Sequence, residues 1–138
     1  MKGKTALTLM EQAMMLLILA LAAALCLQAF VWADTHSRQN SNRDRAMVQL
    51  QSAAEVLKAR QGNILAAAES MGGQADNGVW TLFWDENWVQ TQKPDAFQLC
   101  ATPQDQTTDL LGSALLEIRD QSGTILGSLR IAWQEVLP

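Results

Sequence analysis

The feature that most constrains this chain is an uncharged, almost wholly apolar run near its N-terminus. About 22 residues, from Gln12 to Ala33, carry no charged side chain. A helix of that length reaches roughly 33 Å, which matches the hydrocarbon core of a bilayer. We therefore expect one helix that spans a membrane, followed by a domain on one side of it.

The flanking charges predict the orientation of this span. Lys2 and Lys4 precede the run and Asp34 follows it. Positive charge collects on the cytoplasmic side of membrane helices. We expect a single-pass protein of the cell membrane, with a cytoplasmic N-terminus and an extracytoplasmic C-terminal domain.

A cleaved secretory signal is the main alternative for the apolar run. The tripeptide Val31-Trp32-Ala33 loosely fits a signal-peptidase site. The run is longer than the apolar region of most signals, and Phe30 and Trp32 suit the aromatic belt of a membrane interface better. A lipoprotein signal at Cys26 does not fit, because the bulky Leu25 precedes the cysteine.

Length, charge and cysteine content limit the outer part. About 105 of the 138 residues remain after the span, which is enough for one small domain. From Asp34 onward, eight basic and thirteen acidic residues give a net charge of about −5, so we expect no nucleic-acid partner. Cys26 in the span and Cys100 in the outer domain cannot pair within one chain, so the fold must depend on its core.

The residues after the span predict more helix. Residues 34–45 are polar but contain neither Pro nor Gly, and they lead into an apolar stripe with helical spacing. That stripe comprises Met47, Leu50, Ala54 and Leu57. A flexible stalk at residues 34–45 stays open as an alternative.

A second apolar stripe follows a glycine. We expect Gly62 to bend or end the helix, and Gly72-Gly73 to cap a further helical stretch. The stripe between these glycines comprises Ile64, Leu65, Ala68 and Met71.

Beyond Gly73 the apolar period changes to two, which is typical of strands. In residues 79–84, Trp80, Leu82 and Trp84 share one face. We expect a turn at residues 85–87 that leads into a second strand at Trp88 and Val89.

Further strands are expected toward the C-terminus. A short strand at Phe97 and Leu99 would lie between Pro94 and Pro103. The clearest signal is a hairpin with its turn at residues 120–123. Its first strand alternates Ala114, Leu116 and Ile118 with Leu115, Glu117 and Arg119, and its second strand returns Ile125, Leu129, Ile131 and Trp133 on one face.

The sequence contains no recognisable catalytic or metal-binding constellation. His36 has no second histidine or cysteine at a ligand spacing, and Asp85-Glu86 is typical of a turn. A carbohydrate platform of tryptophans is an alternative, but core packing explains residues at strand positions better. We expect no enzyme activity, no cofactor and no metal site.

The N-terminus, "ALTLMEQAMMLLILALAAAL", resembles the signature of type IV pilins and pseudopilins. In that family a short basic leader precedes a cut site, followed by Thr-Leu, an apolar residue, Glu and a continuous apolar helix. Matched residue by residue, the cut would lie between Ala6 and Leu7, and Thr8, Leu9 and Glu11 would follow. Ala6 and Leu7 stand where the family usually has Gly and Phe.

The resemblance implies roles for these residues. Prepilin peptidase would cut after Ala6 and leave a new, usually methylated, amine on Leu7. Glu11 would be the fifth mature residue, and its carboxylate would pair with the amine of a neighbouring subunit. Thr8 and Leu9 belong to the same assembly segment. A carboxylate at the edge of the hydrocarbon is poorly solvated, which is energetically unfavourable. A cationic partner would stabilise its charged form.

The combined reading is an α+β protein with a pilin-like layout. It has a basic leader (1–6), a transmembrane helix (7–33), an outer helical segment (34–73) and an antiparallel β region (74–138). The implied function is a structural subunit, a minor pilin or pseudopilin, of a type IV pilus-like or type II secretion-like filament, with other subunits and the peptidase as partners. The alternative is an unprocessed membrane-anchored interaction module, for which Glu11 only marks the cytoplasmic boundary.

Overall fold

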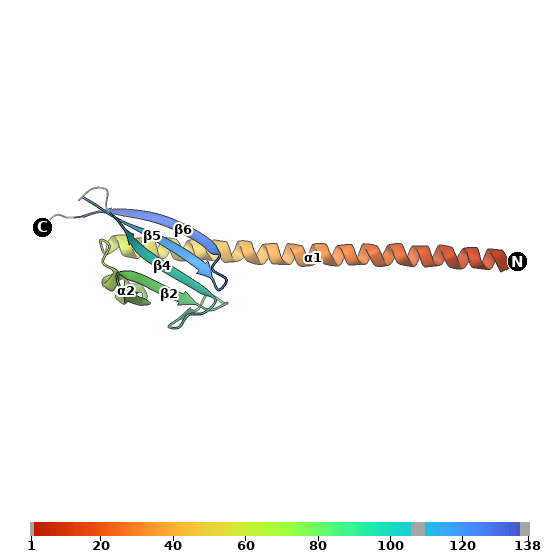
Figure 1. The fold of residues 1–138 in the computed structure, drawn as a ribbon, viewed down its shortest axis with the longest axis horizontal. Helices are drawn as coiled ribbons and strands as arrows, with labels where there is room; N and C mark the ends of the chain where they lie inside the picture. The colour runs from red at the N-terminus through yellow and green to blue at the C-terminus, as the bar shows by residue number, and fades with distance from the viewer. Residues whose placement is uncertain (1, 106–109, 136–138) are drawn as a thin grey trace. The chain divides into compact units, whose positions relative to one another are not determined.

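The structure is a computed structural model that describes residues 2–105 and 110–135. It divides into two compact units, one up to Asn40 and one from Ser41 onward. The helix α1 (Lys2–Ala59) contributes to both units, and everything after it belongs to the second. This confirms the α+β layout of a long N-terminal helix followed by an antiparallel sheet (Figure 1).

The first unit consists of α1 residues whose side chains are exposed throughout. The segment 34–45 is helical, in agreement with the reading that the helix continues past the apolar run. An exposed ion pair, Asp34 with Arg38 at 3.2 Å and one turn apart, supports the helix there. The structure therefore favours a helix over the flexible stalk.

In the second unit, α1 buries one face and then ends at glycine. Its buried residues have helical spacing and comprise Ala46, Leu50, Ala53, Ala54 and Leu57. Gln61 and Gly62 adopt positive φ of 52° and 77°, and the N–H of Gly62 donates to the carbonyl of Leu57 at 2.9 Å. This is the hydrogen bonding of a glycine-terminated helix, so the expected break at Gly62 is an end rather than a bend.

The short helix α2 (Ile64–Met71) begins and ends as the sequence indicates. Asn63 is its N-cap and accepts a hydrogen bond from the N–H of Ala66, and Gly72 is its C-cap. Its buried residue is Ala67, whereas Leu65 is 69% exposed. The assignment of Leu65 to the apolar stripe was therefore wrong.

The described residues form a six-stranded antiparallel sheet in the order β1-β2-β4-β5-β6, and β3 also pairs with β2. The strands are β1 (Gln74–Asp76), β2 (Val79–Trp84), β3 (Gln90–Thr91), β4 (Phe97–Gln104), β5 (Leu111–Asp120) and β6 (Ile125–Gln134). Consecutive strands pair with each other except β3 and β4, since β4 pairs with β2 instead. In Figure 1 the yellow part of α1 lies behind the long strands.

Alternation along the strands produces the core. Trp80, Leu82 and Trp84 are buried on one face of β2, and Leu116 and Ile118 are buried on the same face of β5. These side chains and the buried stripe of α1 form one apolar cluster. The predicted inward faces of β2 and β5 are confirmed. We call the opposite face of the sheet the outer face.

The strand β1 was not predicted, although the sequence contains its turn signal. Asn77 and Gly78 have φ values of 49° and 77°, which is the geometry of a two-residue Asn-Gly hairpin turn. Residues 74–76 have no apolar alternation, because this edge strand faces little core. The Asn-Gly pair, rather than hydrophobic period, was the available signal.

The expected strand at Trp88 and Val89 is wrong. The side chain of Asp85 accepts hydrogen bonds from the N–H groups of Asn87 and Val89, both at 2.9 Å. These bonds extend the turn by two residues, and Trp88 takes a φ of 61° inside it. Pairing with β2 resumes only at Gln90.

Two further boundaries differ from expectation. The strand β4 continues through Pro103, because β2 stops pairing at Ala101 and a proline is tolerated where a strand has an open side. In β6, a register shift places Ile125 opposite Arg119 on the outer face, and Leu126 packs against the core. The prediction that Ile125 shares the face of Leu129 was therefore wrong.

Gly112 leaves a slot for the indole of Trp133, and this generates a first prediction. A Cβ added at Gly112 would lie 2.3 Å from ring atoms of Trp133. We expect Gly112→Ala to lower the free energy of unfolding by about 1–3 kcal/mol through overpacking. The measurement is denaturant unfolding of the full chain in detergent micelles. Gly3→Ala, whose Cβ would meet nothing within 4 Å, is the control, and equal stability of both variants would contradict the slot.

Asp120 generates a prediction about acid. The hydroxyl of Ser122 donates to its carboxylate at 2.6 Å, and the N–H groups of Ser122 and Thr124 donate at 2.9 Å. These bonds, with the Ser122 hydroxyl foremost, lower the pKa of Asp120. A pKa lowered by folding stabilises the fold above the unfolded-state pKa, and that stabilisation is lost as pH falls through the folded-state pKa.

We therefore expect Asp120→Asn to reduce the loss of thermal stability between pH 7 and pH 3. The measurement is the unfolding midpoint of the full chain at both pH values. Glu86→Gln, in the exposed turn before β3, is the control and should keep the acid sensitivity of the unmodified chain. An unchanged acid sensitivity in Asp120→Asn would show that this carboxylate does not contribute.

Candidate functional site

The residues of the N-terminal signature lie on the first turns of α1. Ala6, Leu7, Thr8, Leu9 and Glu11 are all exposed. The hydroxyl of Thr8 donates to the carbonyl of Lys4 at 2.8 Å, so the helix includes the residues before the expected cut.

The helix brings Glu11 next to two other residues of the signature. Leu7 precedes it by four residues and Thr8 by three, so the three side chains lie on one helix face. Within the described residues, no basic group lies in ion-pair distance of Glu11. The arrangement is a single exposed helix face and not a pocket.

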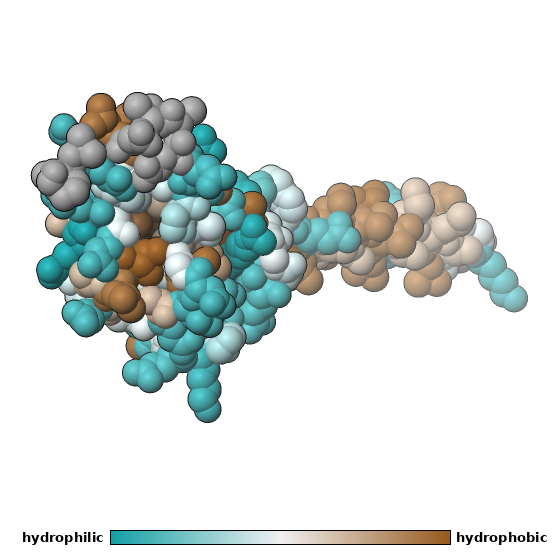
Figure 2. Space-filling model, turned by 60° about the vertical axis from the view of Figure 1, so that its left-hand side comes forward, coloured by the Kyte–Doolittle hydropathy of each residue, from teal (hydrophilic) through white to brown (hydrophobic). Residues whose placement is uncertain are grey.

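The apolar run forms a fully exposed helix surface. Leu7, Leu17 and Leu27 are 70%, 58% and 67% exposed, and similar values hold all round the helix. Figure 2 shows this as brown side chains along the N-terminal segment. By length and composition, α1 is the helix of the described part that is apolar enough to cross a membrane. Each such leucine would gain about 1.5–3 kcal/mol on leaving water.

Polar and aromatic groups follow the apolar run. The ring of Trp32 lies 4.7 Å from that of His36 at a tilt of 41°, and the hydroxyl of Thr35 donates to the carbonyl of Val31. An aromatic ring beside polar side chains suits the boundary between hydrocarbon and water. His36 is exposed in this segment of the helix, as expected of a solvated side chain.

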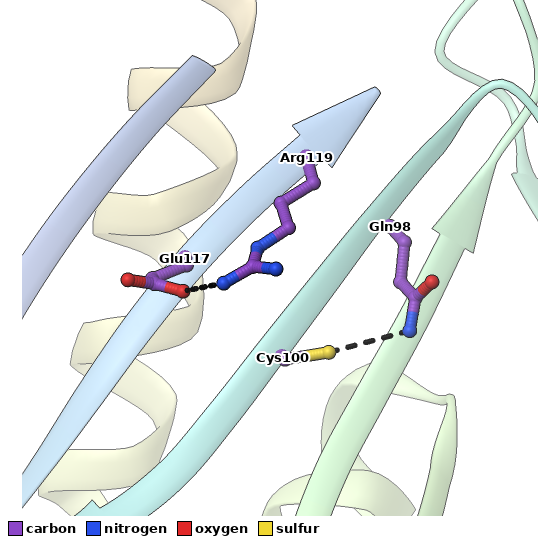
Figure 3. A network of polar contacts seen from close by, with 4 residues as sticks. All are labelled: Gln98, Cys100, Glu117 and Arg119. Carbon is purple, nitrogen blue, oxygen red and sulfur yellow. Dashed lines mark hydrogen bonds and ion pairs between the residues drawn. The ribbon is translucent and has the colours of Figure 1, made fainter. Parts of the chain in front are cut away.

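The outer face of the sheet carries a polar group of four residues (Figure 3). The guanidinium of Arg119 lies 2.8 Å from the carboxylate of Glu117, and this hydrogen bond raises the pKa of Arg119. The amide of Gln98 donates to the Sγ of Cys100 at 3.3 Å. Glu117 lies directly opposite Cys100 in the register.

This outer-face group does not have the geometry of a nucleophilic site. A reactive thiol needs an adjacent base, commonly a histidine, and a site that excludes water. Cys100 instead is half-buried on the outer face of β4, opposite the carboxylate-bearing Glu117 in the register. Exposed ion pairs of this kind contribute little, about 0–1 kcal/mol in general.

The aromatic side chains near Trp88 form a structural cluster. The rings of Trp88 and Phe97 stack at 4.1 Å and 11°, and Trp84 lies 5.9 Å from Trp88. The indole N–H of Trp88 donates to the side chain of Asn42 on α1 at 3.3 Å. The cluster connects the turn after β2 to α1 through this hydrogen bond, and its rings pack against one another. This supports core packing over a carbohydrate platform.

A notch of about 180 Å³ interrupts the sheet edge between β1 and β3. Its lining includes Gln74, Gln90, Thr91 and Gln92, with the buried ring of Phe83 beneath. The volume is below the usual range for small-molecule sites, which begins at about 300 Å³. Sequence reasoning missed the notch, because it depends on the register of β1 and β3, which was not predicted.

Over residues 2–105 and 110–135, no group of three or more His, Cys, Asp or Glu side chains is placed to hold a metal ion. Comparisons with models of protein families, with curated proteins and with solved structures found no match.

Proposed function

We propose that this chain is a structural subunit, a minor pilin or pseudopilin, of a filament of the type IV pilus or type II secretion kind. The observation that carries the proposal is the position of Glu11. It is an exposed carboxylate at the start of an apolar helix surface, five residues into the chain that a cut after Ala6 would leave. The α+β layout of a long helix and an antiparallel sheet supports it.

The physical argument concerns where this carboxylate finds a partner. A charged side chain costs about 2.5–3.5 kcal/mol at the centre of the hydrocarbon on insertion scales, and less toward its edge. A new amine on Leu7 of a neighbouring subunit would neutralise it and fix the axial offset of the two helices. Ala20, Ala24 and Ala29 would permit the close helix approach that this pairing requires.

The proposed setting is the cell membrane, with the N-terminus cytoplasmic and the globular unit outside. Its partners would be other pilin-like subunits and a prepilin peptidase, and no catalytic role is proposed. The competing proposal is an unprocessed anchor that presents the globular unit to another envelope protein. Glu11 would then lie among lipid headgroups without a protein partner.

The state of the N-terminus distinguishes the two proposals. We expect the chain produced with its own prepilin peptidase to begin at Leu7, with methylation of the new amine. The measurement is intact mass and N-terminal sequencing of the membrane-extracted protein. Ala6→Gly, which introduces the residue usual in the family, should be cut at the same bond at least as efficiently. An intact Met1 in both proteins would favour the anchor, and a start near Asp34 would indicate a secretory signal.

A substitution of Glu11 tests its role in assembly. We expect Glu11→Ala to insert into the membrane normally but to enter filaments about tenfold less, the factor that corresponds to 1.4 kcal/mol. The measurement is the ratio of filament-bound to membrane-bound protein. Gln12→Ala, one residue away and on a different helix face, is the matched control. Normal incorporation of Glu11→Ala would exclude the pairing role.

A further inference from the structure

The strand β6 forms a long, open edge of the sheet. It pairs with β5 on one side, and no described strand pairs with its other side. The N–H of Glu135 donates to the carbonyl of Leu110, so Leu110 and Glu135 form a hydrogen-bonded pair. Hydrogen-bonded and non-hydrogen-bonded pairs alternate along an antiparallel ladder. In β6, the N–H and C=O groups of every second residue, counted from Gln134, therefore point away from β5. These residues are Ser128, Arg130, Ala132 and Gln134, and all four are exposed.

This edge has few of the features that keep sheet edges apart. It contains neither proline nor an inward charge, and Arg130 is the charged residue among the four. Long edges of this kind are templates for pairing with another strand. The opposite edge of the sheet is made of the short strands β1 and β3, separated by the notch.

The two edges carry complementary charges at one level. The register joins Ser128, Glu117, Cys100, Thr81 and Gln74 in one row across the sheet. Strands β1 and β6 run in the same direction, and Asp76 and Arg130 each lie two residues beyond this row. Both are therefore on the outer face at the same level, and both are exposed. No group of opposite charge in the described part lies in ion-pair distance of either.

A second row shows an apolar match. The register joins Ile125, Arg119, Gln98, Phe83 and Thr91. Ile125 is 46% exposed at the β6 edge, and Phe83 and Thr91 line the notch at the opposite edge. The register shift that turned Ile125 to the outer face therefore places an apolar side chain at the level of the notch.

We propose that copies of this chain associate side by side through these two edges. The β6 edge of one copy lies parallel to the β1 and β3 edge of the next, Arg130 faces Asp76 of that copy, and Ile125 enters its notch. The contact is heterologous, so each copy offers one edge to each of two neighbours and the contact repeats from copy to copy. This deepens the proposed subunit function, because it names the surface through which the globular units of neighbouring subunits meet.

Strand direction distinguishes this arrangement from a two-fold pairing of β6 with β6. A two-fold pair joins two identical edges with their strands antiparallel, whereas the heterologous contact joins two different edges and keeps all strands of one type in the same direction.

Disulfide cross-linking tests the contact. In full-length chains carrying Cys26→Ala and Cys100→Ser, we would introduce Gln74→Cys and Ser128→Cys, which lie in one row. Neighbouring strands are about 4.8 Å apart, which is within disulfide reach. Oxidation in membrane vesicles from cells lacking the prepilin peptidase should give a ladder of dimers and larger products. Either cysteine alone should give none.

Charge reversal then tests the predicted partners. Asp76→Arg or Arg130→Glu should reduce the ladder about tenfold, and the double reversal should restore it. Glu55→Arg makes the same change in net charge as Asp76→Arg on the exposed side of α1, outside both edges, and should leave the ladder unchanged.

The outcomes separate this proposal from the filament proposal. Dimers formed by Ser128→Cys alone would show a two-fold β6 pair and overturn the heterologous contact. Absence of a ladder from the double-cysteine chain, or a ladder insensitive to both reversals, would also overturn it. Because the vesicles contain no peptidase, these results do not depend on a cut after Ala6. A cut chain without a ladder would refute the edge contact alone.

Discussion

The packing of one face of α1 against the sheet is the interaction on which the globular unit depends. Leu50 and Leu57 are fully buried, and burial of each is worth about 1.5–3 kcal/mol. The alanines between them keep the helix close to the strands. Gly127 lies at a close approach of strand and helix, since a Cβ there would lie 2.9 Å from Leu50. Both cysteines, Cys26 on α1 in the first unit and Cys100 in the sheet, are free, so the apolar layer stabilises the globular unit without a disulfide between them.

The same helix has two unrelated kinds of surface along its length. From Ser41 to Ala59 it has a buried stripe, whereas before Asn40 its apolar side chains are exposed on all sides. A helix that is apolar all round is stable only inside lipid or protein. Both a membrane and a bundle of like helices would supply such surroundings for the first unit. In the proposed bundle, the amine that a cut after Ala6 would leave on Leu7 would give Glu11 a cationic partner.

Sequence reasoning was most accurate where period and burial coincide. The inward faces of β2 and β5, the end of α1 at Gly62 and the cap at Gly72 were predicted because each depends on neighbouring residues. It failed where contacts between distant residues or side-chain hydrogen bonds determine where a strand begins or ends. The carboxylate of Asp85 extended a turn and displaced a strand from Trp88 to Gln90. The roles of Ala6, Leu7 and Glu11 came from a resemblance and stay predictions, since the contacts that would show them involve other chains.

The irregularities of the sheet are also the features that distinguish its two edges. Without the register shift near Leu126, Ile125 would point toward the core and the β6 edge would present only polar and small side chains outward. The gap between β1 and β3 lies opposite Leu82, between the pairs Gln74–Thr81 and Thr91–Phe83. Bulges at sheet edges commonly redirect a side chain or end a pairing. Here the redirected side chain, Ile125, lies in the same row as Phe83 and Thr91, which line the notch at the opposite edge. The proposed contact between copies depends on both irregularities, because one provides the apolar side chain and the other the notch that receives it.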